Sequence, residues 1–224
     1  TVEAIIESGA KPICTEIDST LNMCPEDLLK KISKKTKAVI LVHMLGSPGN
    51  VSKIREICKR KKLHLIEDTA WGIGGKYKKK YLGTIGEIGT FSFDFAKTIT
   101  TGEGGMLLFK RKKHFLKAKA WHDHGHENNP KVPRWEDTRT SSGFNFRMTE
   151  LQGAVGIAQL DKFNQIFRKH QKNRKLIINK LKKFKKIKFR KLPENSSDAP
   201  ESLIFSFDDK KLAKLIPIVF KIII

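Results

Sequence analysis

The sequence has few cysteines, few acidic residues and no long apolar run. Its 224 residues include three cysteines at irregular spacing, namely Cys14, Cys24 and Cys58. That number and spacing fit neither a disulfide framework nor a zinc-binding pattern, so we expect a reducing, cytoplasmic location. No signal peptide is visible, and the longest apolar stretches are far too short to span a membrane.

Acidic residues number 23 against 45 lysines and arginines, which gives a formal net charge of +22. A charge of this size is typical of proteins that bind nucleic acid or an anionic membrane. Here the lysines are spread over nearly every expected helix, and no basic motif with interleaved aromatic residues occurs. We therefore expect no nucleic-acid partner. The charge instead favours the approach of an anionic sugar or a cofactor phosphate.

The hydrophobic pattern predicts an α/β fold. Hydrophobic residues make up 39% of the chain, enough for a packed core. Expected helices alternate with expected apolar strands along the first part of the chain, the helices over 2–8, 25–33 and 51–61 and the strands over 12–18, 38–44 and 63–68. This alternation indicates a mostly parallel sheet. Two further short strands are expected near residues 89–93 and 105–110.

The second half of the chain predicts a loop over 122–143 and then a long helix. Thr149 and Gln152 form a capping box at the start of this helix, which we expect to continue past residue 170. A turn over 193–200 precedes a strand over 202–207 and a helix over 210–216. We therefore divide the chain into a large domain, residues 1–165, and a connecting helix with the start of a small α+β domain, residues 166–224. The abrupt ends suggest a fragment lacking both termini.

Asp68 is the first candidate for chemistry, because it ends an apolar strand just before a glycine-rich loop. In open α/β sheets, ligands bind at the carboxyl ends of the strands. A carboxylate in this place can hold a cationic ring nitrogen, a metal ion or a ribose hydroxyl. It can equally cap the start of a helix.

Lys97 is the second candidate, because it follows an apolar strand and has aromatic neighbours. Partial removal from water favours the neutral, nucleophilic amine that a Schiff-base lysine requires. The hydroxyl and glycine residues around it can present backbone amides to an anion. The alternative is that Lys97 is one more solvated lysine in a lysine-rich chain.

Several ordered motifs resemble the DegT/DnrJ/EryC1/StrS family of sugar aminotransferases. They lie over residues 67–70, 83–86 and 91–105, the last reading Phe-Ser-Phe-x-x-x-Lys-x-x-Thr-Thr-Gly-Glu-Gly-Gly, with flanking matches over 9–18, 43–48 and 143–152. The resemblance covers about residues 1–165. It implies a fold type I (aspartate-aminotransferase-like) large domain and transamination of a keto- or aldehydo-sugar. Glutamate is the expected amino donor, and the product would serve cell-surface polysaccharide or lipopolysaccharide synthesis.

The resemblance also implies pyridoxal 5'-phosphate as the cofactor. Lys97 would form the Schiff base with it and later move a proton, while Asp68 would pair with the protonated pyridine nitrogen. Ser92 would donate its hydroxyl to the cofactor phosphate. Asn145 would reach across the interface of a homodimer to the phosphate in the partner's site.

Three residues are expected on the substrate side by the same resemblance, namely His43, Arg147 and His124. His124 belongs to an alternating set of histidines over residues 122–126. Alternate loop residues do not form a tetrahedral ligand set, and no cysteine lies near them, so we expect no metal site.

Trp71 departs from the family pattern, since relatives usually carry Gln or His three residues after the aspartate. An indole can stack on the cofactor or donate one hydrogen bond, so we expect it in the cofactor site with an effect on substrate range. The stretches 67–72 and 93–98 look most like the branch that makes 8-amino-3,8-dideoxy-octulosonate.

Two alternatives to transamination stand beside it. One is a pyridoxal-phosphate-dependent sugar dehydratase or lyase. In the dehydratase branch of the family histidine replaces the lysine, so an intact Lys97 favours transamination. The other is a regulatory protein that has lost catalysis, which the intact Lys97 and Asp68 argue against.

Overall fold

A computed structural model of the chain describes residues 1–207, and the helix expected over 210–216 lies outside that range. The centre of the fold is a four-stranded sheet in the order β1-β2-β5-β6. Its strands are β1 (Ala38–Val42), β2 (His64–Asp68), β5 (Ile88–Ser92) and β6 (Gly105–Phe109). β1, β2 and β5 run parallel and β6 is antiparallel to β5, which confirms the predicted α/β class with a mostly parallel sheet.

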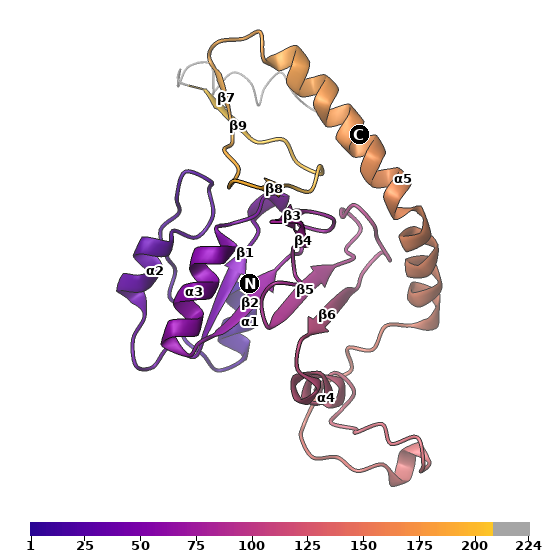
Figure 1. Ribbon diagram of the computed structural model, residues 1–224. Helices are drawn as coiled ribbons and strands as arrows, with labels where there is room; N and C mark the ends of the chain where they lie inside the picture. The colour runs from indigo at the N-terminus through magenta and orange to yellow at the C-terminus, as the bar shows by residue number, and fades with distance from the viewer. Residues whose placement is uncertain (208–224) are drawn as a thin grey trace.

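Helices cover the β1–β2 side of this sheet (Figure 1). They are α1 (Val2–Glu7), α2 (Pro25–Lys31) and α3 (Val51–Lys61). α3 starts where the Asn50 side chain accepts a hydrogen bond from the Lys53 amide, and it ends at Lys62 in the left-handed conformation. Its buried side chains pack with those of β1 and β2 into the core, the set being Val51, Ile54, Ile57, Cys58, Val39, Leu41 and Leu65.

The second half of the chain is more extended. Its elements are α4 (Lys112–Trp121), η2 (Arg134–Glu136), α5 (Glu150–Leu181), β7 (Ile187–Phe189), β8 (Ser196–Ser197) and β9 (Phe205–Phe207). Thr149 and Gln152 form the predicted capping box at the start of α5. β8 pairs with β3 (Lys76–Tyr77), which itself pairs with β4 (Lys80–Tyr81), so the segment after α5 returns to the first half of the chain.

Two features differ from the sequence-based expectations. Residues 12–18 form no strand and make only one isolated bridge, between Ile17 and Met23, because none of the described strands pairs with them. The β3–β4 hairpin was not expected, since lysines occupy most of its positions. α5 continues past residue 170 as expected, and it ends at Leu181.

α5 is a 32-residue helix held along its length by the rest of the chain. At its start, the Gln152 side-chain amide donates to the Glu103 carbonyl at 2.8 Å. In its middle, the rings of Phe163 and Phe167 lie against Gly74, where an added Cβ would come within 2.5 Å of the Phe167 ring. Figure 1 shows the helix running along one side of the molecule, from beside β6 towards the end that carries β7.

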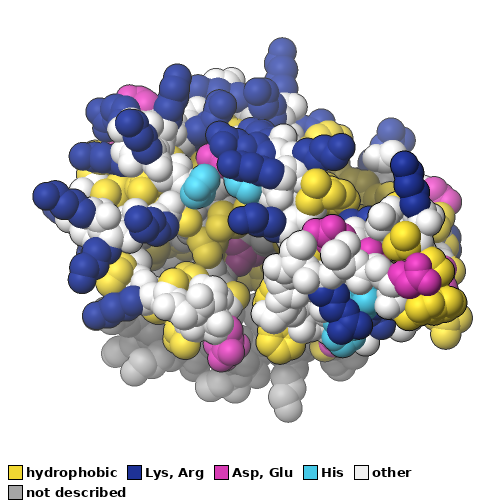
Figure 2. Space-filling view, turned by 90° about the horizontal axis from the view of Figure 1, so that it is seen from below, with side chains coloured by type: hydrophobic (Ala, Val, Ile, Leu, Met, Phe, Trp, Pro, Cys, Tyr) yellow, Lys and Arg dark blue, Asp and Glu magenta, His cyan; other side chains and the backbone are white. Residues whose placement is uncertain are grey.

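Lysine and arginine side chains are spread across much of the face in Figure 2 rather than confined to one cluster. Within residues 1–207, no helix combines the length and the apolar character needed to cross a membrane.

The core packing leads to a stability prediction. Leu41 is completely buried in β1, so Leu41→Ala removes apolar contacts and leaves a cavity. We expect the free energy of unfolding to fall by about 2–5 kcal/mol, measured by urea denaturation. Leu29→Ala is the control, because Leu29 on α2 is 40% exposed and its loss is expected to cost less than about 1 kcal/mol. Equal losses in the two variants would contradict the assignment of the core.

Candidate active site

Two adjacent acidic residues end β2 and face opposite sides of the sheet. Successive side chains of a strand alternate between its two faces. Leu65 and Glu67 are buried, whereas Ile66 and Asp68 are only half-buried. Neighbouring carboxylates therefore enter different surroundings. Glu67 enters the interior, and Asp68 faces the edge where the sheet ends.

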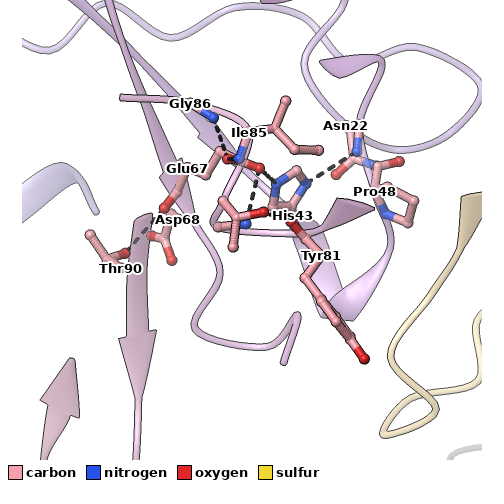
Figure 3. A network of polar contacts seen from close by, with 12 residues as sticks. Asn22, His43, Pro48, Glu67, Asp68, Tyr81, Ile85, Gly86 and Thr90 are labelled. Atoms are coloured by element: carbon pink, nitrogen blue, oxygen red, sulfur yellow. Dashed lines mark hydrogen bonds and ion pairs between the residues drawn. The ribbon is translucent and has the colours of Figure 1, made fainter. Parts of the chain in front are cut away.

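Glu67 is the centre of a buried polar network (Figure 3). Its side chain has no exposure to solvent. One carboxylate oxygen accepts from His43 Nε2 at 3.0 Å and from the Gly83 amide at 3.0 Å. The other accepts from the amides of Ile85, at 2.6 Å, and Gly86. The carboxylate thereby joins the turn before β5 to the end of β1.

Burial by itself would raise the pKa of Glu67. The hydrogen bonds from His43 and from the Gly86 and Gly83 amides outweigh burial and hold the pKa below its usual value. The carboxylate is therefore charged, and it is the charged form that these donors stabilise.

His43 is also fully engaged in this network. Its Nδ1 accepts from the Gly49 amide at 3.3 Å, so Nε2 carries the hydrogen donated to Glu67. The ring is 1% exposed and both of its nitrogens have partners. Asn22 continues the network by accepting from the Met44 amide at 2.9 Å and donating to the Pro48 carbonyl at 3.2 Å. The geometry favours a structural role for His43 over the expected substrate contact.

Asp68 has an oriented carboxylate at the carboxyl end of β2. One oxygen accepts from the Ala70 amide at 3.2 Å, and the other from the Thr1 hydroxyl. The residues directly after Asp68 form turns and not a helix, so the alternative that Asp68 caps a helix is wrong. Both neighbours donate to the carboxylate and so orient its two oxygens.

The loop between β5 and β6, residues 93–104, is held closed by its own hydrogen bonds. The Thr101 amide and the Thr100 hydroxyl both donate to the Phe93 carbonyl, at 2.9 and 3.1 Å. The Phe93 amide in turn donates to the Gly104 carbonyl at 2.8 Å. At the other end of the loop, the Lys97 amide donates to the Asp94 carbonyl at 3.0 Å. The base of the Lys97 side chain is therefore fixed in space.

The amine of Lys97 lies over the face of Trp71. Nζ is 3.6 Å from the centre of the Trp71 ring system, within the range of a cation–π interaction. Trp71 follows Asp68 by three residues, and the two residues lie on the same segment after β2. The indole thus brings the candidate lysine to the same edge of the sheet as the candidate acid.

Ser92 is the last residue of β5, next to β2 in the sheet. Its oxygen accepts from the Asp94 amide at 3.3 Å, which leaves its hydroxyl hydrogen available to an acceptor. Asp68 pairs with Thr90 in the β2–β5 register, so Ser92 lies two residues beyond it at the same sheet edge. An acid, an amine and a hydroxyl donor therefore gather where parallel strands end, the usual place for a ligand in this class of fold.

The other expected residues lie elsewhere, around the buried carboxylate of Asp123. Asp123 accepts from Arg134 and Arg147, and the Arg134 contacts measure 2.9 and 2.6 Å. These hydrogen bonds, Arg134 first, hold the pKa of the Asp123 carboxyl well below its usual range. Asn145 forms a backbone bridge with Asp123, and exposed His124 donates its amide to the Phe144 carbonyl at 3.0 Å.

Within one chain, the contacts of Asn145 and Arg147 are therefore with Asp123, whereas the Lys97 amine contacts Trp71. The Asp123 cluster is bordered by exposed aromatic side chains, with Trp121 45% and Phe146 62% exposed. No group of three or more potential metal ligands occurs in residues 1–207.

The residues at the β2–β5 edge fit pyridoxal phosphate in their chemistry. The cofactor needs an amine for its aldehyde, an anion for its protonated ring nitrogen and donors for its phosphate. Lys97, the oriented carboxylate of Asp68 and the Ser92 hydroxyl are of these three kinds. Sequence reasoning missed Glu67 as the support of this edge, although an acid alternating with buried leucine in an apolar strand was the signal for it.

Comparison with known proteins places the chain in one family of aminotransferases. The DegT/DnrJ/EryC1/StrS aminotransferase family matches residues 1–216. The chain is 43% identical over 162 residues to GDP-perosamine synthase of Escherichia coli O157:H7, covering 72% of this chain and 43% of that protein. It is 37% identical over 169 residues to GDP-perosamine synthase of Vibrio cholerae, covering 75% of this chain and 45% of that protein.

Solved structures agree with this match. Helicobacter pylori PseC, an aminotransferase involved in the biosynthesis of pseudaminic acid, superimposes with a TM-score of 0.88 at 25% identity, over 98% of this chain and 58% of that one. The chain spans less than half the length of the two synthases it resembles.

The Glu67 network predicts a pH-dependent loss of stability. Glu67→Gln replaces an acceptor of four hydrogen bonds, so we expect the free energy of unfolding at pH 7 to fall by about 3 kcal/mol or more. The folded-state pKa is depressed, so the contribution of Glu67 is complete above the ordinary value of 4.5 and is lost as the pH falls through the lowered pKa. Urea denaturation of the wild type and of Glu67→Gln from pH 7 to pH 3 measures their free energies of unfolding, and we expect the difference between them to shrink as the pH falls.

Glu87→Gln is the matched control. Glu87 pairs with His64 at 2.9 Å, but its side chain is 27% exposed, so its loss is expected to cost about 1 kcal/mol or less. Equal losses of unfolding free energy in Glu67→Gln and Glu87→Gln would refute the role given to Glu67. A loss in Glu67→Gln that does not change with pH would refute it as well.

Proposed function

We propose, starting from the fact that the chain belongs to the DegT/DnrJ/EryC1/StrS aminotransferase family, that the protein transfers an amino group to a keto- or aldehydo-sugar with pyridoxal 5'-phosphate as cofactor. The single observation that carries the proposal is the meeting of Lys97, Trp71 and the Asp68 segment at one edge of the sheet. The similarity to two GDP-perosamine synthases supports the sugar as substrate class.

The contacts of each residue support the role proposed for it. Lys97 is the amine that binds the cofactor and afterwards moves a proton at the substrate carbon. Asp68 holds the proton on the ring nitrogen, since two donors already orient its carboxylate. Ser92 donates its free hydroxyl hydrogen to the phosphate, and the Trp71 indole lies beside the Lys97 amine. Pyridoxal phosphate, when bound, supplies the carbonyl group that accepts the amino group and the ring that withdraws electrons.

Asn145, Arg147 and His124 are proposed to act on the site of a second copy in a homodimer. Within one chain they gather around Asp123, whereas the amine of Lys97 lies over the Trp71 ring. The exposed aromatic side chains Trp121, Phe144 and Phe146 beside them support a contact with another chain. Arg147 then faces the anionic part of the substrate.

The nature of the sugar is the finer part of the proposal. Several relatives carry names of enzymes that act on nucleotide-linked sugars, among them dTDP-4-dehydro-2,3,6-trideoxy-D-glucose 4-aminotransferase of Saccharopolyspora spinosa, 34% identical over 176 residues. The motif around Trp71 instead points to an 8-oxo-3-deoxy-octulosonate, which carries a carboxylate in place of a nucleotide. Glutamate is the proposed amino donor in both cases. Either acceptor is anionic and suits the net charge of +22.

Replacement of the lysine tests the activity. In the intact gene product, Lys97→Ala should reduce sugar amination to the uncatalysed background, because the substitution removes the amine that would bind the cofactor. Lys113→Ala, at an exposed lysine in α4, should leave the rate within about twofold of the wild type. Borohydride reduction followed by mass spectrometry should find the cofactor on the Lys97 peptide alone. Normal turnover by Lys97→Ala would overturn the proposal.

Product analysis separates transamination from the alternatives. Incubation with glutamate and a keto-sugar should give an amino-sugar and 2-oxoglutarate in equal amounts, and omission of glutamate should stop the reaction. A deoxygenated keto-sugar as product would show a dehydratase. A protein that takes up no pyridoxal phosphate would instead be a regulatory family member. A panel of nucleotide-linked keto-sugars and the 8-oxo-octulosonate, compared by kcat/KM, identifies the substrate class.

A further inference from the structure

Trp135 is an exposed aromatic side chain on the short helical turn η2. It is 84% exposed, and within residues 1–207 its ring meets no other aromatic ring and no cation. Tryptophan is highly buried on average, so an indole left in water is unusual. Figure 1 shows that the loop after α4, which carries η2, extends away from the central sheet. The ring is therefore open to a partner.

The turn that carries this indole is fixed at its start. Arg134 donates to both carboxylate oxygens of Asp123, at 2.9 and 2.6 Å, and the Asp123 side chain is only 3% exposed. Pro133 precedes the turn with a φ angle of −60°, the value to which its ring restricts it. The Glu136 amide donates to the Pro133 carbonyl at 3.0 Å and closes the turn around Trp135.

Asp137 fixes the end of the same turn. Its side chain is 3% exposed, and one oxygen accepts from the Asn128 amide at 2.8 Å and lies 3.1 Å from His126 Nδ1. The other oxygen accepts from the Asn129 amide at 3.0 Å. The backbone of Trp135 is thus held between two anchored parts of the loop. An aromatic ring on a rigid support can bind a ligand with little loss of conformational entropy.

The indole lies next in sequence to a cluster with surplus positive charge. Asp123 accepts from Arg147 through the same oxygen that accepts from Arg134, so one carboxylate meets two guanidinium groups. The Arg134 side chain is 50% exposed and that of Arg147 is 42% exposed. Glu136 is exposed and pairs with neither guanidinium within residues 1–207. A partner that fits this surface presents a negative charge beside an apolar face.

We propose that Trp135 is a substrate-binding residue whose indole packs against the ring of the anionic sugar acceptor. The inference rests on the proposed function, in which Arg147 faces the anionic part of the substrate in the site of a second copy. Arg134 shares Asp123 with Arg147, so the neighbouring Trp135 belongs to the same rigid unit. The acceptor supplies an anion for a guanidinium group and a ring face with C–H groups for an indole.

Calorimetry of sugar binding by the intact gene product with its cofactor tests this contact. Without an amino donor no turnover occurs, so the titration reports binding alone. The probes are a GDP-linked keto-sugar and the 8-oxo-octulosonate, titrated separately. For the acceptor that the wild type binds, Trp135→Ala should raise Kd about five- to twentyfold. Trp135→Phe, which keeps an aromatic ring, should recover most of the affinity.

Kinetics in the presence of glutamate give a second measure of the same contact. Trp135→Ala should raise KM for the acceptor by a factor similar to that in Kd and leave kcat within about twofold, because the ring contacts the sugar away from the reacting carbon. Phe184→Ala is the matched control, since Phe184 is an aromatic residue 55% exposed just after α5. It should leave both Kd and KM unchanged.

Sedimentation analysis separates a sugar contact from a contact between subunits. Trp135→Ala should keep the mass of the wild-type assembly. Dissociation of this variant into smaller species would identify the indole as a subunit contact and overturn the inference. An unchanged Kd in the folded variant, for the acceptor that the wild type binds, would overturn it as well.

The outcome is separable from that of the proposed function. Weaker sugar binding by Trp135→Ala, in a protein whose wild type transfers no amino group, would keep the sugar contact and refute the aminotransferase. Normal amination together with unchanged binding in Trp135→Ala would do the reverse. A wild type that binds neither probe would refute both.

Discussion

The edge of the sheet that carries the site depends on one buried carboxylate. Glu67 accepts hydrogen bonds from the end of β1 through His43 and from the turn before β5 through three backbone amides. A charge in the interior is tolerated only when its acceptor capacity is filled, and here it is filled by donors from two separate segments. The positions of these segments, and with them the backbone on both sides of Asp68, are coupled through this single group.

β2 places two acids side by side in the sequence and gives them different surroundings through the alternation of a strand. The inward residue is enclosed by donors and has no room for a ligand. The outward residue, Asp68, keeps a half-buried carboxylate with donors from Ala70 and Thr1. The support of the site and its chemistry are thus one residue apart, and a shift of register by one position would exchange them.

Local patterns predicted much of the fold. The continuous apolar runs of β1 and β2, the proline at the start of α2 and the capping box of α5 each identified an element, and the alternation of helices and strands identified the α/β class. The expected strand over 12–18 was wrong because a strand requires a partner, which no local pattern supplies.

The same limit applies to the candidate site. Asp68, Ser92 and Lys97 could be predicted, because they lie at or after the ends of apolar strands and Ser92 and Lys97 belong to the family-like motif over residues 91–105. Glu67 was missed because attention went to the neighbouring Asp68. The return of the chain after α5 was not predicted either, because it follows from the Arg174–Asp198 and Gly46–Ala199 contacts, which depend on tertiary packing. His43 was placed on the substrate side by resemblance, while its burial is a property of the folded network.

The single long helix α5 constrains how the chain can change in length. Gln152, near its first turn, holds the Lys97 loop, and Arg174, six turns later, holds the returning segment. Insertion of one residue between them would rotate Arg174 by about 100° around the helix axis and take it away from Asp198. Insertions and deletions are therefore tolerated poorly between 152 and 174, whereas the loop over 127–133, which is mostly exposed, can absorb them. In descendants of this gene, the spacing of those two residues will be preserved even where their surroundings diverge.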